Sequence, residues 1–128
     1  MAETIVNVRY IIDDVPAAIA FYIEHLGFTL ETDASPAFAM MARGALRLAL
    51  SGPKSSGARA MPTGDKPAPG GWNRIQLVTN DLAGDVARLR AAGVTFQNDI
   101  ISGPGGLQIL LRDPSGNAIE LFQPMQRP

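Results

Sequence analysis

Two segments of this 128-residue chain follow the same pattern, and this repeat limits the possible folds more than any other feature. In each segment an apolar stretch is followed by an aspartate, by apolar residues at helical spacing, and by a glycine that precedes a new apolar stretch. The aspartates are Asp14 and Asp81, 67 positions apart (81 − 14), and the glycines are Gly27 and Gly93. Aspartate is a favoured helix N-cap and glycine a favoured helix end, so each segment predicts a strand–helix–strand unit. In the first segment either Asp13 or Asp14 can be the cap. We expect the two halves to place equivalent positions around one shared site.

Alternating apolar residues and turn residues predict the other strands. We expect strands at residues 5–12, 28–30, 38–41 and 45–50 in the first half, and at 74–79, 94–96, 107–112 and 118–122 in the second half. The last two strands form a hairpin across residues 113–117, which include a proline and a glycine suited to a turn. The predicted fold class is α+β, with two βαβββ modules in tandem that form a cup-shaped mixed sheet and carry their helices on the outer face.

Equivalent positions follow from these alignments. The offset of 67 pairs Asn7 with Arg74. The turn glycines Gly44 and Gly116 lie 72 positions apart (116 − 44), and this offset pairs Leu48 with Glu120.

Composition excludes several classes of function. The net charge of −1 and the 46% of hydrophobic residues are ordinary for a globular domain, and no basic stripe suggests a nucleic-acid partner. The absence of cysteine excludes disulfides, thiolate catalysis and cysteine metal sites. No apolar run approaches the roughly 20 residues of a membrane span, and the first residues do not resemble a signal peptide. We therefore expect a cytoplasmic protein without membrane partners.

We expect one domain over residues 1–128, with a first module at 4–52, a linker at 53–71 and a second module at 72–124. The region between the modules is rich in glycine, proline and serine and is long for a simple connection. Two interpretations of it stay open, a flexible linker and a lid over the site.

Two motifs carry a resemblance to a known family. The first is Asp14-Val15-x-x-Ala18-x-x-Phe21-Tyr22-x-x-x-Leu26-Gly27-Phe28, and the second is Asp113-Pro114-Ser115-Gly116-Asn117-Ala118-Ile119-Glu120-Leu121. With the two βαβββ modules, they resemble the vicinal oxygen chelate superfamily. This superfamily includes glyoxalase I, extradiol dioxygenases, fosfomycin-modifying enzymes, and the bleomycin and mitomycin resistance proteins. The resemblance covers the chain from about Ile5 to Pro124.

The resemblance also implies that this chain has lost the metal site of the superfamily. In metal-using members, four positions hold one divalent cation, and they correspond here to Asn7, Leu48, Arg74 and Glu120. Leucine donates nothing, and arginine places a fixed positive charge where the cation would lie. We therefore expect no metal, no cofactor and no catalytic residue. Arg74 and Glu120 are expected to form a charge-assisted pair instead. Whether that pair is purely structural or also meets an oxygen of a ligand stays open.

Alternation assigns the expected ligand contacts. Asn7, Arg9, Arg74 and Gln76 are expected on one side of the cup, and Leu48, Leu50 and Phe122, with Leu46, on the other. Trp72, Phe38 and Met40 offer a stacking surface, and Glu120 completes the set. His25, the single histidine, is expected at the surface.

The leading hypothesis is metal-independent binding of a small aromatic or planar molecule, neutral or anionic, which resembles the antibiotic-sequestering members. The alternative is a glyoxalase-, lyase- or dioxygenase-like enzyme that uses a displaced metal or Glu120. A homodimer is expected, because family members commonly combine halves of two chains and because open strand edges and the leucine-rich strand at 46–50 need covering.

Overall fold

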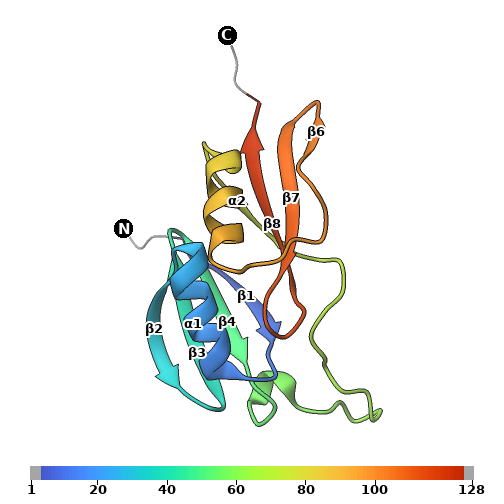
Figure 1. Ribbon diagram of the computed structural model, residues 1–128. Coiled ribbons are helices and arrows are strands. Elements are labelled where there is room, and N and C mark those ends of the chain that lie inside the picture. The colour runs from blue at the N-terminus through green and yellow to red at the C-terminus, as the bar shows by residue number, and fades with distance from the viewer. Residues whose placement is uncertain (1–3, 126–128) are drawn as a thin grey trace. The chain divides into compact units, whose positions relative to one another are not determined.

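The computed structural model describes residues 4–125, which form two successive βαβββ modules (Figure 1). The first contains β1 (Val6–Ile11), α1 (Val15–Leu26), β2 (Thr29–Ala34), β3 (Phe38–Arg43) and β4 (Leu46–Ser51). A short 3-10 helix, η1 (Ser56–Ala58), follows. The second contains β5 (Ile75–Val78), α2 (Leu82–Ala91), β6 (Ile101–Gly103), β7 (Gly106–Arg112) and β8 (Ala118–Pro124). The predicted α+β class and repeated module are confirmed. Within the described residues, no helix is long and apolar enough to cross a membrane.

The chain divides into two compact units. The first unit holds the residues up to Gly70 together with the turn Pro114–Asn117, and the second holds Gly71–Asp113 and the residues from Ala118 onward. Each unit contains a four-stranded mixed sheet, in the order β1-β4-β3-β2 in the first and β5-β8-β7-β6 in the second. In both sheets the first and last strands of the module pair in parallel, and the other pairs are antiparallel. The two sheets therefore have the same topology.

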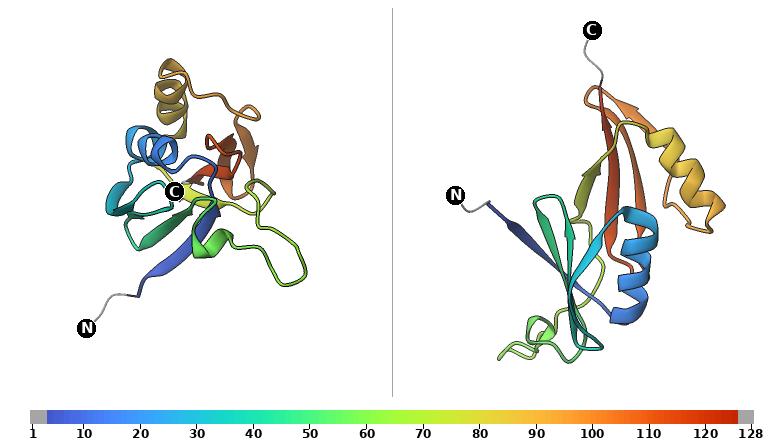
Figure 2. Two further views of the ribbon diagram at one scale, coloured as in Figure 1. Left: turned by 90° about the horizontal axis from the view of Figure 1, so that it is seen from below. Right: turned by 90° about the vertical axis from the view of Figure 1, so that its left-hand side faces the viewer.

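Both helices begin where the repeated aspartates predicted. The Asp14 carboxylate accepts a hydrogen bond from the Ala17 amide at 3.1 Å, and Asp81 accepts one from the Gly84 amide at the same distance. Gly27 ends α1 in the left-handed conformation, with φ 71°. In each unit, the apolar side of the helix packs on one face of that unit's sheet (Figure 2). The opposite face of each sheet is not covered by the helix of its unit.

The predicted strand at 94–96 is wrong. This segment makes only an isolated bridge, between Phe96 and Leu111, and the true third element of the module is β6. The reason lies in Asn98, whose side-chain oxygen accepts the Leu110 amide at 2.9 Å. The Asn98 side chain thus binds the Leu110 amide, which a continuous pair of strands would have bonded to a backbone carbonyl. Regular strand pairing stops at this point.

The late sequence motif forms a turn that is fastened to the first unit. The Ser115 hydroxyl accepts the Asp13 amide at 2.9 Å. Asn117, which is 4% exposed, donates to the Ile11 carbonyl at 2.8 Å and accepts the Gly70 amide at 2.9 Å. The motif therefore holds the end of β1 and the end of the long linker in place.

Candidate functional site

Strand pairing sorts the side chains of the second unit onto two faces. Residues that lie opposite each other in neighbouring strands share a face, and Glu120 lies opposite both Gln76 and Leu110. The alternate residues, Ile75, Leu77, Ile109, Leu111, Ile119 and Leu121, are buried on the side of the helix. Arg74, Gln76 and Glu120 thus share the face away from α2, together with Gln108, Leu110 and Arg112. Phe122 shares this face too, although it was expected on the opposite side of the cup from Arg74 and Gln76. We call this the open face of the second unit.

Glu120 is the centre of this face and is only 5% exposed. One carboxylate oxygen, Oε1, accepts hydrogen bonds from Nε and Nη2 of Arg74, each at 3.0 Å. The other, Oε2, accepts from the Gln76 side-chain amide at 2.6 Å. The predicted Arg74–Glu120 pair is therefore present, although Arg74 precedes β5 rather than lying within it. Charge-assisted bonds of this kind fix the orientation of all three side chains.

Trp72 and Arg112 extend the open face of the second unit. The Arg112 guanidinium lies over the Trp72 ring, 5.4 Å from its centre, and Trp72 remains 65% exposed. Arg112 also donates to the Gly71 carbonyl and to the Gln97 side chain, both at 2.8 Å. Sequence analysis missed Arg112. The signal was available, because Arg112 pairs with Ala118, two positions before Glu120 on the same face.

The first unit has an open face of its own. Asn7, Arg9, Phe38 and Met40 all lie on it, as predicted, since Asn7 pairs with Arg47, and both Arg9 and Met40 pair with Ala49. Asn7 and Arg9 are exposed, and Phe38 and Met40 are half-buried. Arg47 is bound to Glu31 at 2.6 Å, and Arg9 lies across η1, so close to Gly57 that a Cβ there would overlap its guanidinium.

Leu48 and Leu50 do not lie on the open face of the first unit. They pair with Val8 and Tyr10, belong to the side covered by α1, and are 0% exposed. Their assignment as ligand contacts is contradicted, because it came from aligning two turns of different length. The backbone bonds from Ile12 to Ser51 and from Thr79 to Phe122 give the correct offset of 71 between β4 and β8. Ala49, not Leu48, is thus equivalent to Glu120, and a one-residue slip exchanges the faces of a strand.

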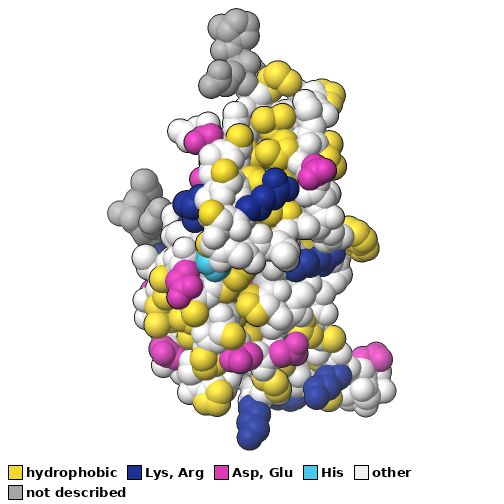
Figure 3. Space-filling view, in the orientation of Figure 1, with side chains coloured by type: hydrophobic (Ala, Val, Ile, Leu, Met, Phe, Trp, Pro, Cys, Tyr) yellow, Lys and Arg dark blue, Asp and Glu magenta, His cyan; other side chains and the backbone are white. Residues whose placement is uncertain are grey.

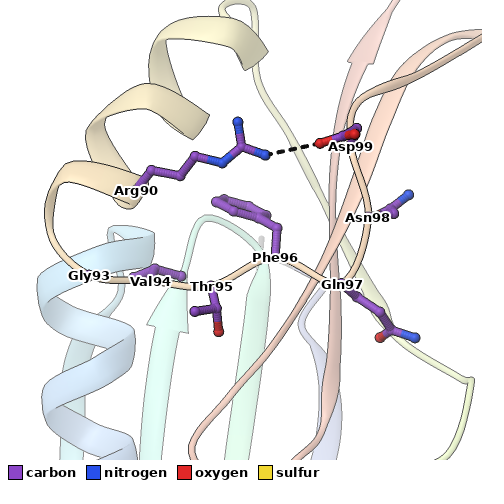
Figure 4. Close-up of a pocket in the computed structure, with 8 residues that line it drawn as sticks. All are labelled: Arg90, Gly93, Val94, Thr95, Phe96, Gln97, Asn98 and Asp99. Carbon is purple, nitrogen blue, oxygen red and sulfur yellow. Dashed lines mark hydrogen bonds and ion pairs between the residues drawn. The ribbon is translucent and has the colours of Figure 1, made fainter.

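A hollow of about 640 Å³ in the second unit is lined by none of the side chains assigned to the open face of that unit. It is formed by the end of α2 and residues 93–99, where Arg90 reaches over the Phe96 ring toward Asp99 (Figure 4). The polar side chains that follow Phe96 serve the fold, because Asn98 binds the Leu110 amide and Gln97 binds Arg112. This hollow brings no reactive set of side chains together.

Two further groups lie outside the open faces. His25 is half-buried, packs edge-on against Phe21 with ring centres 5.3 Å apart, and reaches the surface (Figure 3). Hydrogen bonds from the Ser35 hydroxyl and amide lower the pKa of Asp33, near the end of β2.

Comparison with known proteins identifies the family. The model of the Glyoxalase/Bleomycin resistance protein/Dioxygenase superfamily matches residues 4–121. The chain belongs to this superfamily. No curated protein matches the chain. Among solved structures, TnmS3, an antibiotic binding protein from Streptomyces sp. CB03234, is 28% identical, with a TM-score of 0.74 over 97% of this chain and 98% of that one.

Two other solved structures are also similar to the chain. A glyoxalase/bleomycin resistance protein from Streptomyces sp. CB03234 is 29% identical, with a TM-score of 0.67 over 91% of this chain and 97% of that one. Lactoylglutathione lyase from Agrobacterium tumefaciens reaches a TM-score of 0.75 over 96% and 95% of the two chains. Because its identity is 22%, it shows a shared fold alone.

The side chains at the superfamily's metal positions do not fit a divalent cation. With the corrected register these positions are Asn7 and Ala49 in the first unit, and Arg74 and Glu120 in the second. Alanine has no donor atom, and both oxygens of Glu120 already accept hydrogen bonds. Among residues 4–125, no group of three or more histidine, cysteine, aspartate or glutamate side chains is placed to hold a metal. What these positions offer to a ligand is hydrogen-bonding groups and a guanidinium group.

Proposed function

We propose that this protein binds a small planar aromatic molecule, neutral or anionic, without a metal and without changing its bonds. The observation that carries the proposal is the open face of the second unit. There Arg74 neutralises Glu120, and the Trp72 ring, which lies against the Arg112 guanidinium, keeps 65% of its surface exposed to a ligand. Aromatic rings and guanidinium groups recognise planar and anionic groups by stacking and hydrogen bonding.

The charges on both open faces support the choice of ligand class. The ion pairs on these faces are Arg47 with Glu31 in the first unit and Arg74 with Glu120 in the second. A second arginine lies on each face, Arg9 in the first unit and Arg112 in the second. Arginine thus exceeds acid on each face, which favours an anion over a cation. For that reason a cationic drug such as bleomycin is a poor candidate. The relative described as an antibiotic binding protein supports binding rather than turnover as the function.

The second candidate is an enzyme of the same superfamily, lyase- or dioxygenase-like, as the lactoylglutathione lyase fold suggests. Glu120 is the observation in its favour, because a buried carboxylate is a common general acid or base. An enzyme of either type requires a metal bound elsewhere or a carboxylate free to exchange protons. Metal analysis of the purified protein separates the two candidates, since about one tightly bound divalent ion per chain supports the enzyme.

Three naphthalene compounds test the binding proposal: 2-naphthoate (anion), 2-naphthol (neutral) and 2-naphthylmethylammonium (cation). Calorimetry should show binding of the first two, with the cation at least about tenfold weaker. Because Trp72 is the single tryptophan, its fluorescence reports whether they bind near it. Arg74→Ala should weaken 2-naphthoate binding by about 1–3 kcal/mol, the scale of a charged hydrogen bond, whereas Arg90→Ala should change nothing. If the wild-type protein binds none of the three compounds and turns over a hemithioacetal, the binding proposal fails and the enzyme candidate replaces it.

We further propose that the protein acts in the cytoplasm as a homodimer, as one domain that spans both modules and their linker. The leucine-rich strand β4 needs no cover from a second chain, because it lies between β1 and β3 and is already largely buried. Open strand edges favour a dimer, because β1 and β5 are edge strands of their sheets. Both carry exposed apolar residues, Val6 at 56% and Val78 at 55%.

A further inference from the structure

Trp72 lies outside the helices and strands, and two arginine side chains hold the backbone around it. The residue precedes β5, which begins at Ile75. Nη1 of Arg112 donates to the Gly71 carbonyl at 2.8 Å, and Nη1 of Arg74 donates to the Trp72 carbonyl at 3.3 Å. Two successive carbonyls are thus bound by side chains of the open face of the second unit. These bonds fix a segment that strand pairing does not reach.

Arg112 is itself held in place. Its Nε donates to Oε1 of Gln97 at 2.8 Å, its Nη1 donates to the Gly71 carbonyl, and its guanidinium lies over the Trp72 ring, 5.4 Å from the ring centre. A guanidinium offers its donors in a rigid planar fork and also stacks on aromatic rings, so one arginine can make all three contacts. The Trp72 ring therefore rests against a support that is anchored from two other directions.

The contact with Arg112 covers only part of the ring, because Trp72 remains 65% exposed. An aromatic ligand can stack on the surface that is left. When a ligand has to order a loose side chain, the free energy of that ordering is lost from the affinity, and a ring that is already fixed avoids the loss. A second pair, Arg90 over Phe96, has the same 5.4 Å separation, but Phe96 is half-buried and offers less surface to a ligand.

We propose that Arg112 is a positioning residue, which holds the Trp72 ring as a preformed surface on which the planar ligand stacks. This inference rests on the proposed binding function and assigns it a residue that acts through Trp72 and not on the ligand directly. It requires that binding of a neutral ring, and not only of an anion, depends on Arg112.

Binding of 2-naphthol measures this role without a charge on the ligand. In calorimetry, Arg112→Leu should weaken the binding by about 3- to 10-fold, the cost of ordering one side chain. Arg112→Lys should recover only part of the loss, since an ammonium group cannot bind Gly71 and Gln97 in a planar fork. In a Trp72→Leu background, Arg112→Leu should have no further effect, because the ring on which it acts is gone. The control is Arg90→Leu, at the second pair, which should leave the affinity unchanged.

The ring of Trp72 supplies a second measurement in the absence of a ligand. Because Trp72 is the single tryptophan, the fluorescence anisotropy of the protein reports the freedom of this ring. Arg112→Leu should lower the anisotropy, Arg112→Lys should lower it less, and Arg90→Leu should not change it. If Arg112→Leu does not fold, Gln97→Leu removes one anchor of Arg112 instead and should lower both anisotropy and affinity.

Three results would overturn the positioning role and leave the binding function standing. The first is unchanged 2-naphthol affinity in the folded variant, and the second is unchanged anisotropy. The third is a loss of affinity on Arg112→Leu that persists in the Trp72→Leu background, because Arg112 would then contact the ligand itself. Failure of the wild-type protein to bind any of the naphthalene compounds counts against the binding function and removes this inference with it.

Discussion

Glu120 shows how one residue's neighbours decide its chemistry. In the metal-using relatives a glutamate at this place holds a cation, whereas here the carboxylate lies between Arg74 and Gln76. The sequence was sufficient to predict the Arg74 pair, because an arginine stood at the equivalent position of a metal ligand. It was not sufficient to predict the Gln76 contact or the Arg112–Trp72 stack, which depend on side-chain conformation and not on alternation alone.

Replacing Arg74 by leucine should destabilise the protein by about 1.5–3 kcal/mol, since a carboxylate that is 5% exposed loses its charged partner and keeps only an amide donor. Urea unfolding monitored by circular dichroism measures this loss. Arg90→Leu is the matched control, because Arg90 is 53% exposed and contacts a fully exposed aspartate at 3.5 Å. Equal stability of the two variants would mean that the Arg74–Glu120 pair contributes nothing to the fold.

At the scale of the elements, the helix caps and most of the strands could be predicted, but β6 and the register of β4 could not. The β3–β4 turn and the β7–β8 turn differ in length, with Arg43 paired to Leu46 in the first and Arg112 paired to Ala118 in the second. Aligning their glycines therefore shifted β4 by one residue. Because side chains alternate, that small error moved Leu48 and Leu50 from the core to the predicted site. Only the backbone hydrogen bonds resolve such a shift.

Glutamate substitutions at neighbouring positions test this register. Leu48→Glu should cost at least about 3 kcal/mol, because it buries a charge among the apolar residues beneath α1. Ala49→Glu should cost less, because Ala49, although only 3% exposed, is paired with Arg9, whose guanidinium can neutralise the new carboxylate. Thermal unfolding measures the stability of the two variants. If Leu48→Glu yields no folded protein, the milder variants Leu48→Thr and Ala49→Thr are compared instead. Greater damage from Ala49→Glu would contradict the assigned faces.

At the scale of the whole molecule, the two units repeat one topology yet keep different surfaces. The open face of the first unit combines arginine with half-buried Phe38 and Met40, and that of the second combines arginine with Glu120 and exposed Trp72. The repeated pattern predicted the shared topology because helix caps and alternation are local signals. It did not predict the differences, which arise from single side chains and from the linker.

Each sheet also leaves one parallel-paired strand at its edge, and this arrangement leads to the prediction for assembly. β1 and β5 each have one neighbour in their sheet, and exposed valines make these edges apolar. Such edges favour pairing with another copy of the chain.

Sedimentation velocity at micromolar concentration should therefore show a dimer. Val6→Lys or Val78→Lys should shift the protein toward monomer, because each places a charge at an edge strand. Ile23→Lys, at a 44%-exposed position on α1 and on neither edge strand, should leave the dimer intact. A wild-type monomer under these conditions would contradict the homodimer, and dissociation caused equally by Ile23→Lys would place the interface on the helix instead.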